Sequence, residues 1–230
     1  AGEDEPPSGW TSWPRWGRTA ALLAVLTFYV NSASISTHAA ALDRRDSVAK
    51  RWVTTAREEL REKPYTTVFD APVPGQVVAS VFLDASWASR VLGTLPEGED
   101  RFNRTTDRLG VFDADGRLRG VEIVAATRSG VGPIPGCGWA LSGETVGIPL
   151  PRRLRASDWV VRIGYYTATG AAARVDVGRD RFSVQVPPGL GYLYVFPRHA
   201  VDDVSVTGVD VDTPVCVANV TVGRAWPRER

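Results

Sequence analysis

Apolar and polar residues alternate in a series of short stretches between Trp159 and Gly223. Alternation with period two puts successive side chains on opposite faces of a β-strand, and Gly, Pro or Asp residues separate the stretches. Short strands with turn residues between them are typical of antiparallel sandwiches and barrels. The pattern therefore predicts a mainly β fold, an antiparallel β-sandwich with its core over residues 131–226. The apolar positions are Trp159, Val161, Ile163 and Tyr165, Phe182, Val184 and Val186, Tyr192, Tyr194 and Phe196, Val204 and Val206, Val215 and Val217, and Val220 and Val222.

Residues 64–130 predict a smaller, strand-containing linker subdomain. Strands are expected at 66–70, 109–112 and 118–126, with a further strand at 143–150. The segment Asp113-Ala114-Asp115-Gly116 predicts a hairpin turn between two of these strands. Its two aspartates also match part of a calcium loop, which would need more oxygen ligands and a distal Glu. Asp210 and Asp212 share one face of a predicted strand, and the alternatives there are a solvated face or a cation site at a loop edge, such as a structural calcium ion.

The N-terminal third predicts attachment to a membrane. Residues 1–18 form a leader: an acidic, disordered tail, followed by Trp10, Trp13 and Trp16 interleaved with arginines, as at a membrane interface. Residues 19–42 predict a transmembrane helix, strongly apolar at first and then small and polar; spanning a bilayer takes about 20 residues. A signal-peptide core and a buried soluble helix are the alternatives. Residues 43–63 predict an amphipathic helix that Pro64 ends.

Composition limits the classes of function. The chain carries 27 basic and 26 acidic residues, a balance that argues against a nucleic-acid binder. It contains no methionine, so we expect a piece of a longer protein. Cys137 and Cys216 are either two buried cysteines of a reduced protein or, in an oxidising compartment, a disulfide. By closing its loop, that disulfide would add about 4 kcal/mol to the free energy of unfolding.

No specific catalytic motif is present in the sequence. It has no Gly-rich phosphate loop, no nucleophile elbow and no His/Cys metal spacing, so whether the chain is an enzyme stays open. His38 and His199 are expected to be ordinary polar residues. Asp70 and Asp84 could act as an acid/base pair only if the fold brought them within about 10 Å of each other.

Aromatic residues in the second half of the chain suggest carbohydrate binding. Most of them are expected in the core, because their alternation puts them on inward faces. Tyr165 and Tyr166 are consecutive, however, so one of the two must lie outside the core of a regular strand. We single out Trp139 and Tyr166 as candidate residues for stacking against sugar rings.

The order of these features resembles the carboxy-terminal part of a family of actinobacterial polytopic membrane proteins that are similar to glycosyltransferases. Five segments carry the resemblance after the predicted membrane helix. They are AREELREKP (56–64), the Asp-Ala-Pro-Val-Pro segment (70–74), GPIPGCGW (132–139), WVVRIGYYTATG (159–170) and VCVANVTVG (215–223).

The resemblance implies a function in cell-envelope glycan assembly. It implies a β-sandwich of jelly-roll type, similar to a carbohydrate-binding module, on the extracytoplasmic face of the cell membrane. Such a module would contact the acceptor glycan of an enzyme that uses lipid-linked sugar donors, and would pack on upstream or partner membrane helices. The family's catalytic acid lies in an earlier loop, so no catalytic residue is assigned here. The alternative is a non-enzymatic interaction module that packs on partner membrane proteins.

Overall fold

The structure is a computed structural model that describes residues 15–78, 87–93, 101–154 and 159–228. Most of the predicted leader lies outside these residues, and so does Asp84. Within helix α1 (Arg15–Glu62) only the backbone is described at 15, 16, 18, 19, 31 and 33–42, which includes His38. The chain divides into two compact units, Ala1–Val48 and Ala49–Arg230.

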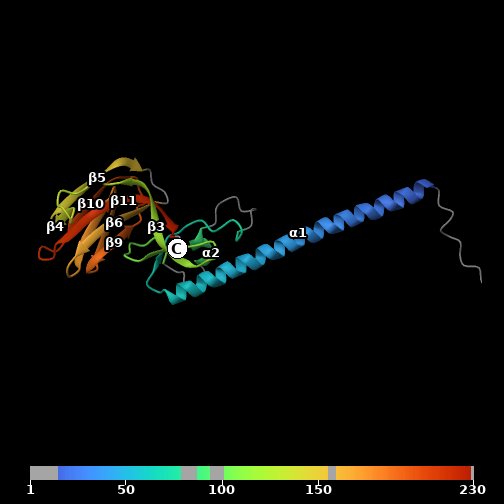
Figure 1. The fold of residues 1–230 in the computed structure, drawn as a ribbon, viewed down its shortest axis with the longest axis horizontal. Helices are drawn as coiled ribbons and strands as arrows, with labels where there is room; N and C mark the ends of the chain where they lie inside the picture. Colours follow the sequence, from blue (N-terminus) through green and yellow to red (C-terminus); the bar gives the residue numbers. More distant parts are fainter. Residues whose placement is uncertain (1–14, 79–86, 94–100, 155–158, 229–230) are drawn as a thin grey trace, which may run out of the picture. The chain divides into compact units, whose positions relative to one another are not determined.

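Strands form most of the second unit (Figure 1). It also contains the short helix α2 (Ala88–Leu92). The strands are β1 (Thr67–Val68), β2 (Leu109–Phe112), β3 (Leu118–Arg128), β4 (Trp139–Leu141), β5 (Thr145–Leu154), β6 (Val160–Thr167), β7 (Ala171–Val177), β8 (Asp180–Val186), β9 (Gly189–Val195), β10 (Val201–Gly208) and β11 (Val215–Pro227).

These strands make two sheets. The larger sheet has the order β1-β2-β3-β11-β6-β9, with β4 also paired to β11, and the smaller has the order β5-β10-β7-β8. The pair β1–β2 is parallel, and the other strand pairs are antiparallel. The predicted mainly β, two-sheet fold is thereby confirmed. The 64–130 segment therefore contributes β1, β2 and β3 to the larger sheet, through the pairing of β3 with β11.

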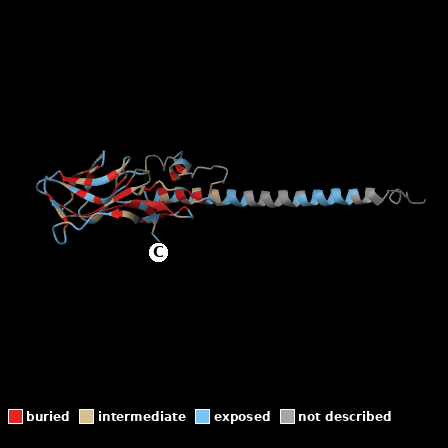
Figure 2. Cartoon of the chain, turned by 90° about the horizontal axis from the view of Figure 1, so that it is seen from above, coloured by how far each residue is buried: buried red, intermediate tan, exposed pale blue. Residues whose placement is uncertain are grey.

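The main core lies between the two sheets. Val161, Ile163 and Tyr165 of β6 pack there, as the alternation predicts. Facing them are Val175 and Val177 of β7 and the valines of β10. Figure 2 shows the buried positions as red bands along the strands. Burial of these aliphatic side chains is the main term that holds the two sheets together.

Part of the larger sheet is also covered on its other face. There Val160 of β6, Tyr194 of β9 and Ala225 of β11 pack with Phe69, which follows β1. A third cluster joins the last turns of α1 to this region through apolar side chains. These are Trp52, Ala56 and Leu60, which pack with Val68, Val73, Ala88, Leu92, Phe112 and Leu118.

Arg101 fastens the C-terminal end of α1. Its guanidinium donates hydrogen bonds to the carbonyl oxygens of Leu60 and Thr66, each at 2.6 Å, and to that of Lys63. The last carbonyls of a helix have no partners within the helix, so this arginine satisfies them.

Helix α1 corrects the prediction of two helices. One helix of 48 residues runs from Arg15 to Glu62 in place of separate helices at 19–42 and 43–63. The reason is that no Gly or Pro stands between Arg18 and Lys63, so nothing breaks the backbone where the polarity changes. Among the residues that the structure describes, no helix has the length and apolarity needed to cross a membrane.

The strands differ from the prediction in several respects. Strand β7 was not predicted, because its inward residues Ala171 and Ala173 are weak signals of a strand. The stretches 215–217 and 220–222 belong to one strand, β11, which contains a bulge between Val217 and Asn219. Asp210 and Asp212 lie in the loop before β11 and not on a strand face.

Candidate ligand-binding face on the larger sheet

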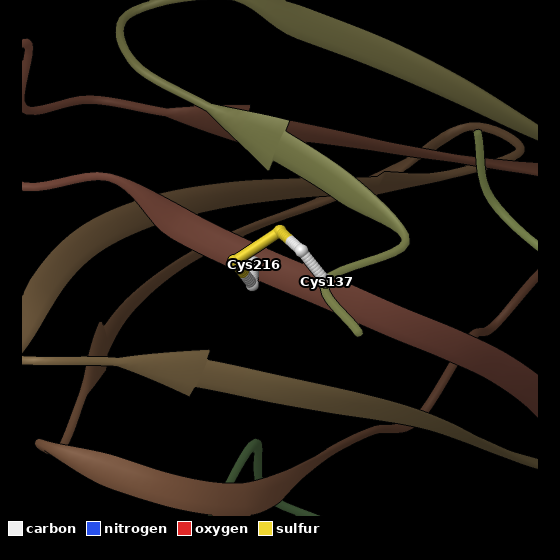
Figure 3. The surroundings of a disulfide bond; sticks show 2 residues. All are labelled: Cys137 and Cys216. Carbon is white, nitrogen blue, oxygen red and sulfur yellow. A yellow bond between two sulfur atoms is a disulfide. The ribbon is translucent and has the colours of Figure 1, made fainter. Parts of the chain in front are cut away.

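The predicted disulfide is present and lies on the larger sheet. It joins Cys137, in the turn before β4, to Cys216 in β11, with a Cα–Cα distance of 5.0 Å (Figure 3). The turn is closed by paired backbone hydrogen bonds between Ile134 and Gly138. Gly138 has a φ of +84°, and a Cβ there would lie 2.2 Å from the carbonyl oxygen of Val217, so no other residue fits.

Tyr166 stands next to this disulfide on the outer face of the sheet. In the register of the strands it lies between Cys216 of β11 and Leu190 of β9. Its side chain is 50% exposed, whereas that of Tyr165 is 4% exposed and points into the core. The expectation that the two consecutive tyrosines separate to opposite faces is confirmed.

The next row of the same face is built around a glycine. Gly164 of β6 lies between Asn219 of β11 and Tyr192 of β9. The exposed Asn219 side chain reaches across it, since a Cβ at Gly164 would lie 3.2 Å from the amide nitrogen and oxygen. Tyr192 is 45% exposed. The row therefore presents an aromatic ring and an amide with no side chain between them.

Arg162 forms the third row, between Thr221 and Tyr194. Its guanidinium carbon lies 4.7 Å from the centre of the Tyr192 ring, a cation–π contact that holds the charge on this face. Tyr194 is 8% exposed, and burial raises the pKa of its phenol above the ordinary value, although the charge of Arg162 acts in the opposite direction. The apolar cluster that covers part of this face therefore includes Tyr194 but leaves Tyr192 exposed.

We call the open part of this surface the aromatic face. It consists of Arg162, Gly164, Tyr166, Leu190, Tyr192 and Asn219.

Trp139 does not join this face. It pairs with Val217 on β11, and its half-buried side chain packs against the core between the sheets. Since paired residues on neighbouring strands share a face, Trp139 and Tyr166 lie on opposite faces of the sheet. The structure therefore does not bring together the two residues that the sequence suggested for sugar stacking.

Tyr192 is the residue that sequence reasoning missed. The alternation Tyr192, Tyr194, Phe196 was interpreted as facing the core, but Leu193 and Val195 occupy that position. Both sets alternate with period two, and large aromatic residues are as typical of strands as the aliphatic ones. Gly189 and Gly191 of the same strand were the available signal. They share the parity of Leu193 and Val195, and glycine in a strand often marks a position that another group approaches closely.

The remaining polar candidates have structural roles. Asp70 accepts hydrogen bonds from the backbone N–H of Ser89 (3.0 Å) and its hydroxyl (2.6 Å). Asp180 accepts hydrogen bonds from the backbone of Arg198 and His199 and lies 2.9 Å from the His199 ring. Within the described ranges, no group of three or more His, Cys, Asp or Glu residues is placed to hold a metal ion.

A cavity of about 460 Å³ lies elsewhere, beside the end of β11. Its wall is mainly apolar, with Phe69, Trp87 and Trp226. The two charged side chains on the wall already make contacts within the protein: Asp113 bonds in its own turn, and Arg224 lies 5.5 Å from the Trp159 ring centre. The aromatic face is therefore the better-equipped site for a polar ligand.

Comparisons with known proteins do not identify a family. No protein-family model matches the chain, and no curated protein matches it. Among solved structures, one titled "BiXyn10A CBM1 APO" matches 34% of this chain and 62% of its own, with 10% identity and a TM-score of 0.27. Another, titled "Crystal structure of a ruminal GH26 endo-beta-1,4-mannanase", matches 44% of this chain and 22% of its own, with 14% identity and a TM-score of 0.26. The chain thus spans less than two thirds of either protein, and the likeness is distant.

Proposed function

We propose that this chain is an extracytoplasmic β-sandwich module that contacts glycans through the aromatic face. The observation that carries the proposal is the pair of exposed tyrosines, Tyr166 and Tyr192, set diagonally on neighbouring strands of an open sheet. Tyrosine combines a large apolar ring with a polar tip, which suits the apolar faces and hydroxyl rims of sugar rings. The Asn219 amide beside them supplies a donor and an acceptor.

The disulfide supports an extracytoplasmic location. Disulfides persist in oxidising compartments and are rare in a reducing cytosol. This one also fixes the turn at Cys137 to the strand position beside Tyr166. A backbone that is fixed beside a binding residue loses less freedom when a ligand binds, which favours binding.

The finer assignment is a module of a cell-envelope glycosyltransferase. We propose that the module, of carbohydrate-binding type, holds an acceptor glycan while chemistry with a lipid-linked donor takes place elsewhere in the longer protein. We assign no reaction to the residues described here. Attachment to the cell membrane would use the apolar part of α1, where the large side chains are exposed. They are Leu22, Leu23, Val25, Leu26, Phe28, Tyr29 and Val30.

The test is glycan titration monitored at the tyrosines. A panel of envelope-type oligosaccharides is added to the protein, and the NMR signals of the aromatic rings are followed. We expect shifts in Tyr166 and Tyr192, and we expect Tyr166→Ala to weaken binding about tenfold, since a stacked aromatic contributes about 0.5–1.5 kcal/mol in addition to the area that it buries. Tyr65→Ala is the matched control, because Tyr65 is 81% exposed and outside the face. A panel that moves neither ring would overturn the proposal.

A second candidate is an interaction module that packs on partner membrane proteins without a glycan. The observation in its favour is the exposed apolar surface, including Leu190 at 83% exposure within the aromatic face itself. Tyrosine and arginine are also enriched at protein interfaces. The same titration separates the two, because this candidate expects no ring shift with any glycan.

A further inference from the structure

We propose that the aromatic face selects glycans that carry an anionic group, a carboxylate or a phosphate, next to the stacked ring, and that Arg162 determines this selection. The inference rests on the proposed glycan-binding function and deepens it. It assigns a chemical class to the ligand of that same face.

The charge pattern around Arg162 is the first argument. The neighbouring outer-face positions of β6, β9 and β11 contain no acidic residue. Nor does Arg162 form an ion pair with any residue in the part of the chain that the structure describes. A half-buried guanidinium that forms no ion pair leaves a local positive potential that favours an anion. These positions are Gly164, Tyr166, Leu190, Tyr192, Tyr194, Cys216, Asn219 and Thr221.

The orientation of the guanidinium is the second argument. The cation–π contact with Tyr192 holds it against one of the two rings proposed to stack on sugar. Its Nε is buried and has no hydrogen-bond partner among the residues that the structure describes. A guanidinium presents paired N–H donors that match carboxylate and phosphate oxygens, and such charge-assisted bonds are about twice as strong as neutral ones.

A second arginine extends the same row. Arg128 of β3 pairs with Thr221, which pairs in turn with Arg162. The two arginines are two strand spacings apart, which is about 10 Å between their backbones. Long side chains can approach one ligand group across this distance. Arg128 is exposed. The row therefore contains a second positive charge, two strands away from Arg162.

Matched sugars with and without charge test the inference. The full chain, kept soluble in non-ionic detergent, is titrated with glucose, glucuronate, glucose 1-phosphate and inorganic phosphate at low ionic strength, with ring and guanidinium NMR signals as the readout. We expect at least one of the two charged sugars to bind about tenfold more tightly than glucose, the factor that one charge-assisted hydrogen bond supplies. Which of the two is preferred identifies the anion.

Variants assign the preference to Arg162. Arg162→Gln is expected to reduce the tenfold preference to about one, while Arg162→Lys retains part of it, because lysine keeps the charge but not the paired donors. Arg152→Gln, an exposed arginine on β5 of the other sheet, is the matched control and should keep the full preference. Thermal unfolding of each variant verifies that it is folded.

The possible failures can be told apart. Equal affinity for glucose and both charged sugars would overturn the inference and leave the glycan-binding function standing. A preference that persists in Arg162→Gln would also overturn it. Inorganic phosphate bound as tightly as glucose 1-phosphate would overturn it too, because the ring would then contribute nothing. If no sugar shifts Tyr166 or Tyr192, the proposed function itself fails.

Discussion

Asp113 determines the turn between β2 and β3 through its carboxylate. One oxygen accepts hydrogen bonds from the backbone N–H groups of Asp115 (3.0 Å) and Arg117 (2.9 Å), and the other accepts one from the Arg119 side chain at 2.9 Å. Partial burial raises the pKa of Asp113, but the hydrogen bonds from Arg119, Arg117 and Asp115 outweigh it and hold the pKa below its ordinary value. These residues therefore form a hairpin turn, as the sequence predicted.

Removing the charge of Asp113 should cost stability in a way that depends on pH. A carboxyl group whose folded pKa is lowered stabilises the fold above its ordinary pKa of about 3.9 and loses that contribution as pH falls through the lowered value. We expect Asp113→Asn to reduce the free energy of unfolding by about 1 kcal/mol at pH 7. The deficit should shrink below about pH 4. Urea unfolding at pH 7 and pH 2.5 measures both.

Asp115→Asn is the control for this prediction. Asp115 sits in the same turn, but its side chain is exposed, so its loss should change stability little. A deficit for Asp113→Asn that stays constant down to pH 2.5 would contradict a role for the ionised carboxylate.

At the scale of residues the sequence predicted the site in part. Two consecutive tyrosines in a strand cannot share a face, and the apolar alternation through Ile163 and Tyr165 indicates that Tyr166 is the outward one. The outward position of Tyr192 does not, because β9 has apolar residues at both parities. Which parity faces the core depends on the partner strand and on the cover over Tyr194, and neither is local in sequence.

At the scale of elements the disulfide links the turn before β4 to the first residues of β11. Its two cysteines are 79 residues apart, and most of the sandwich lies between them in the chain. A cross-link restricts the unfolded chain more than the folded one, so it raises the free energy of unfolding.

We therefore expect the double variant Cys137→Ser, Cys216→Ser to lose about 4 kcal/mol of stability. The measurement is urea unfolding of the variant and of the parent protein, each with and without a reductant. Reductant should lower the stability of the parent to that of the variant and leave the variant unchanged. If the parent and the variant unfold at the same urea concentration, the disulfide contributes nothing to the folded state.

Some elements could not be predicted from the pattern of apolar and polar residues. The strands rich in Val, Phe or Tyr were predicted, whereas β7 escaped because alanine carries little strand preference. The continuity of α1 follows from the absence of helix breakers, a feature visible in the sequence but outweighed there by the change from an apolar to an amphipathic pattern. The order of the strands in each sheet depends on long-range pairing that periodicity does not encode.

At the scale of the whole molecule, the first unit differs from the second in what it exposes. From Ala20 to Val30 every residue of α1 is exposed, and most of them are apolar (pale blue in Figure 2). Exposed apolar surface of this extent marks a site of contact with lipid or with another protein. Of these two, the proposed attachment to a membrane requires that the exposed apolar residues of α1 contact lipid.

Vesicle flotation tests the attachment. The full chain is mixed with vesicles of phosphatidylcholine and phosphatidylglycerol, and the bound fraction is measured. Leu22→Gln with Leu26→Gln should lower the partition at least about tenfold, since burying one leucine is worth about 1.5–3 kcal/mol. Val209→Gln with Val211→Gln, two exposed valines in the loop before β11, should bind as the parent does. Equal flotation of both double variants would contradict lipid contact through α1.

The bulge in β11 has a consequence for how related chains should be compared. Val217 and Val220 both face the core, although residues three apart in a regular strand point to opposite faces. Ala218 is the extra residue of the bulge, and it restores the same facing after an odd number of residues. A homologue that lacks this residue would keep every inward and outward assignment on both sides of the gap. Alignments should therefore permit a one-residue deletion at Ala218, in the middle of a strand, where gaps are ordinarily penalised most heavily.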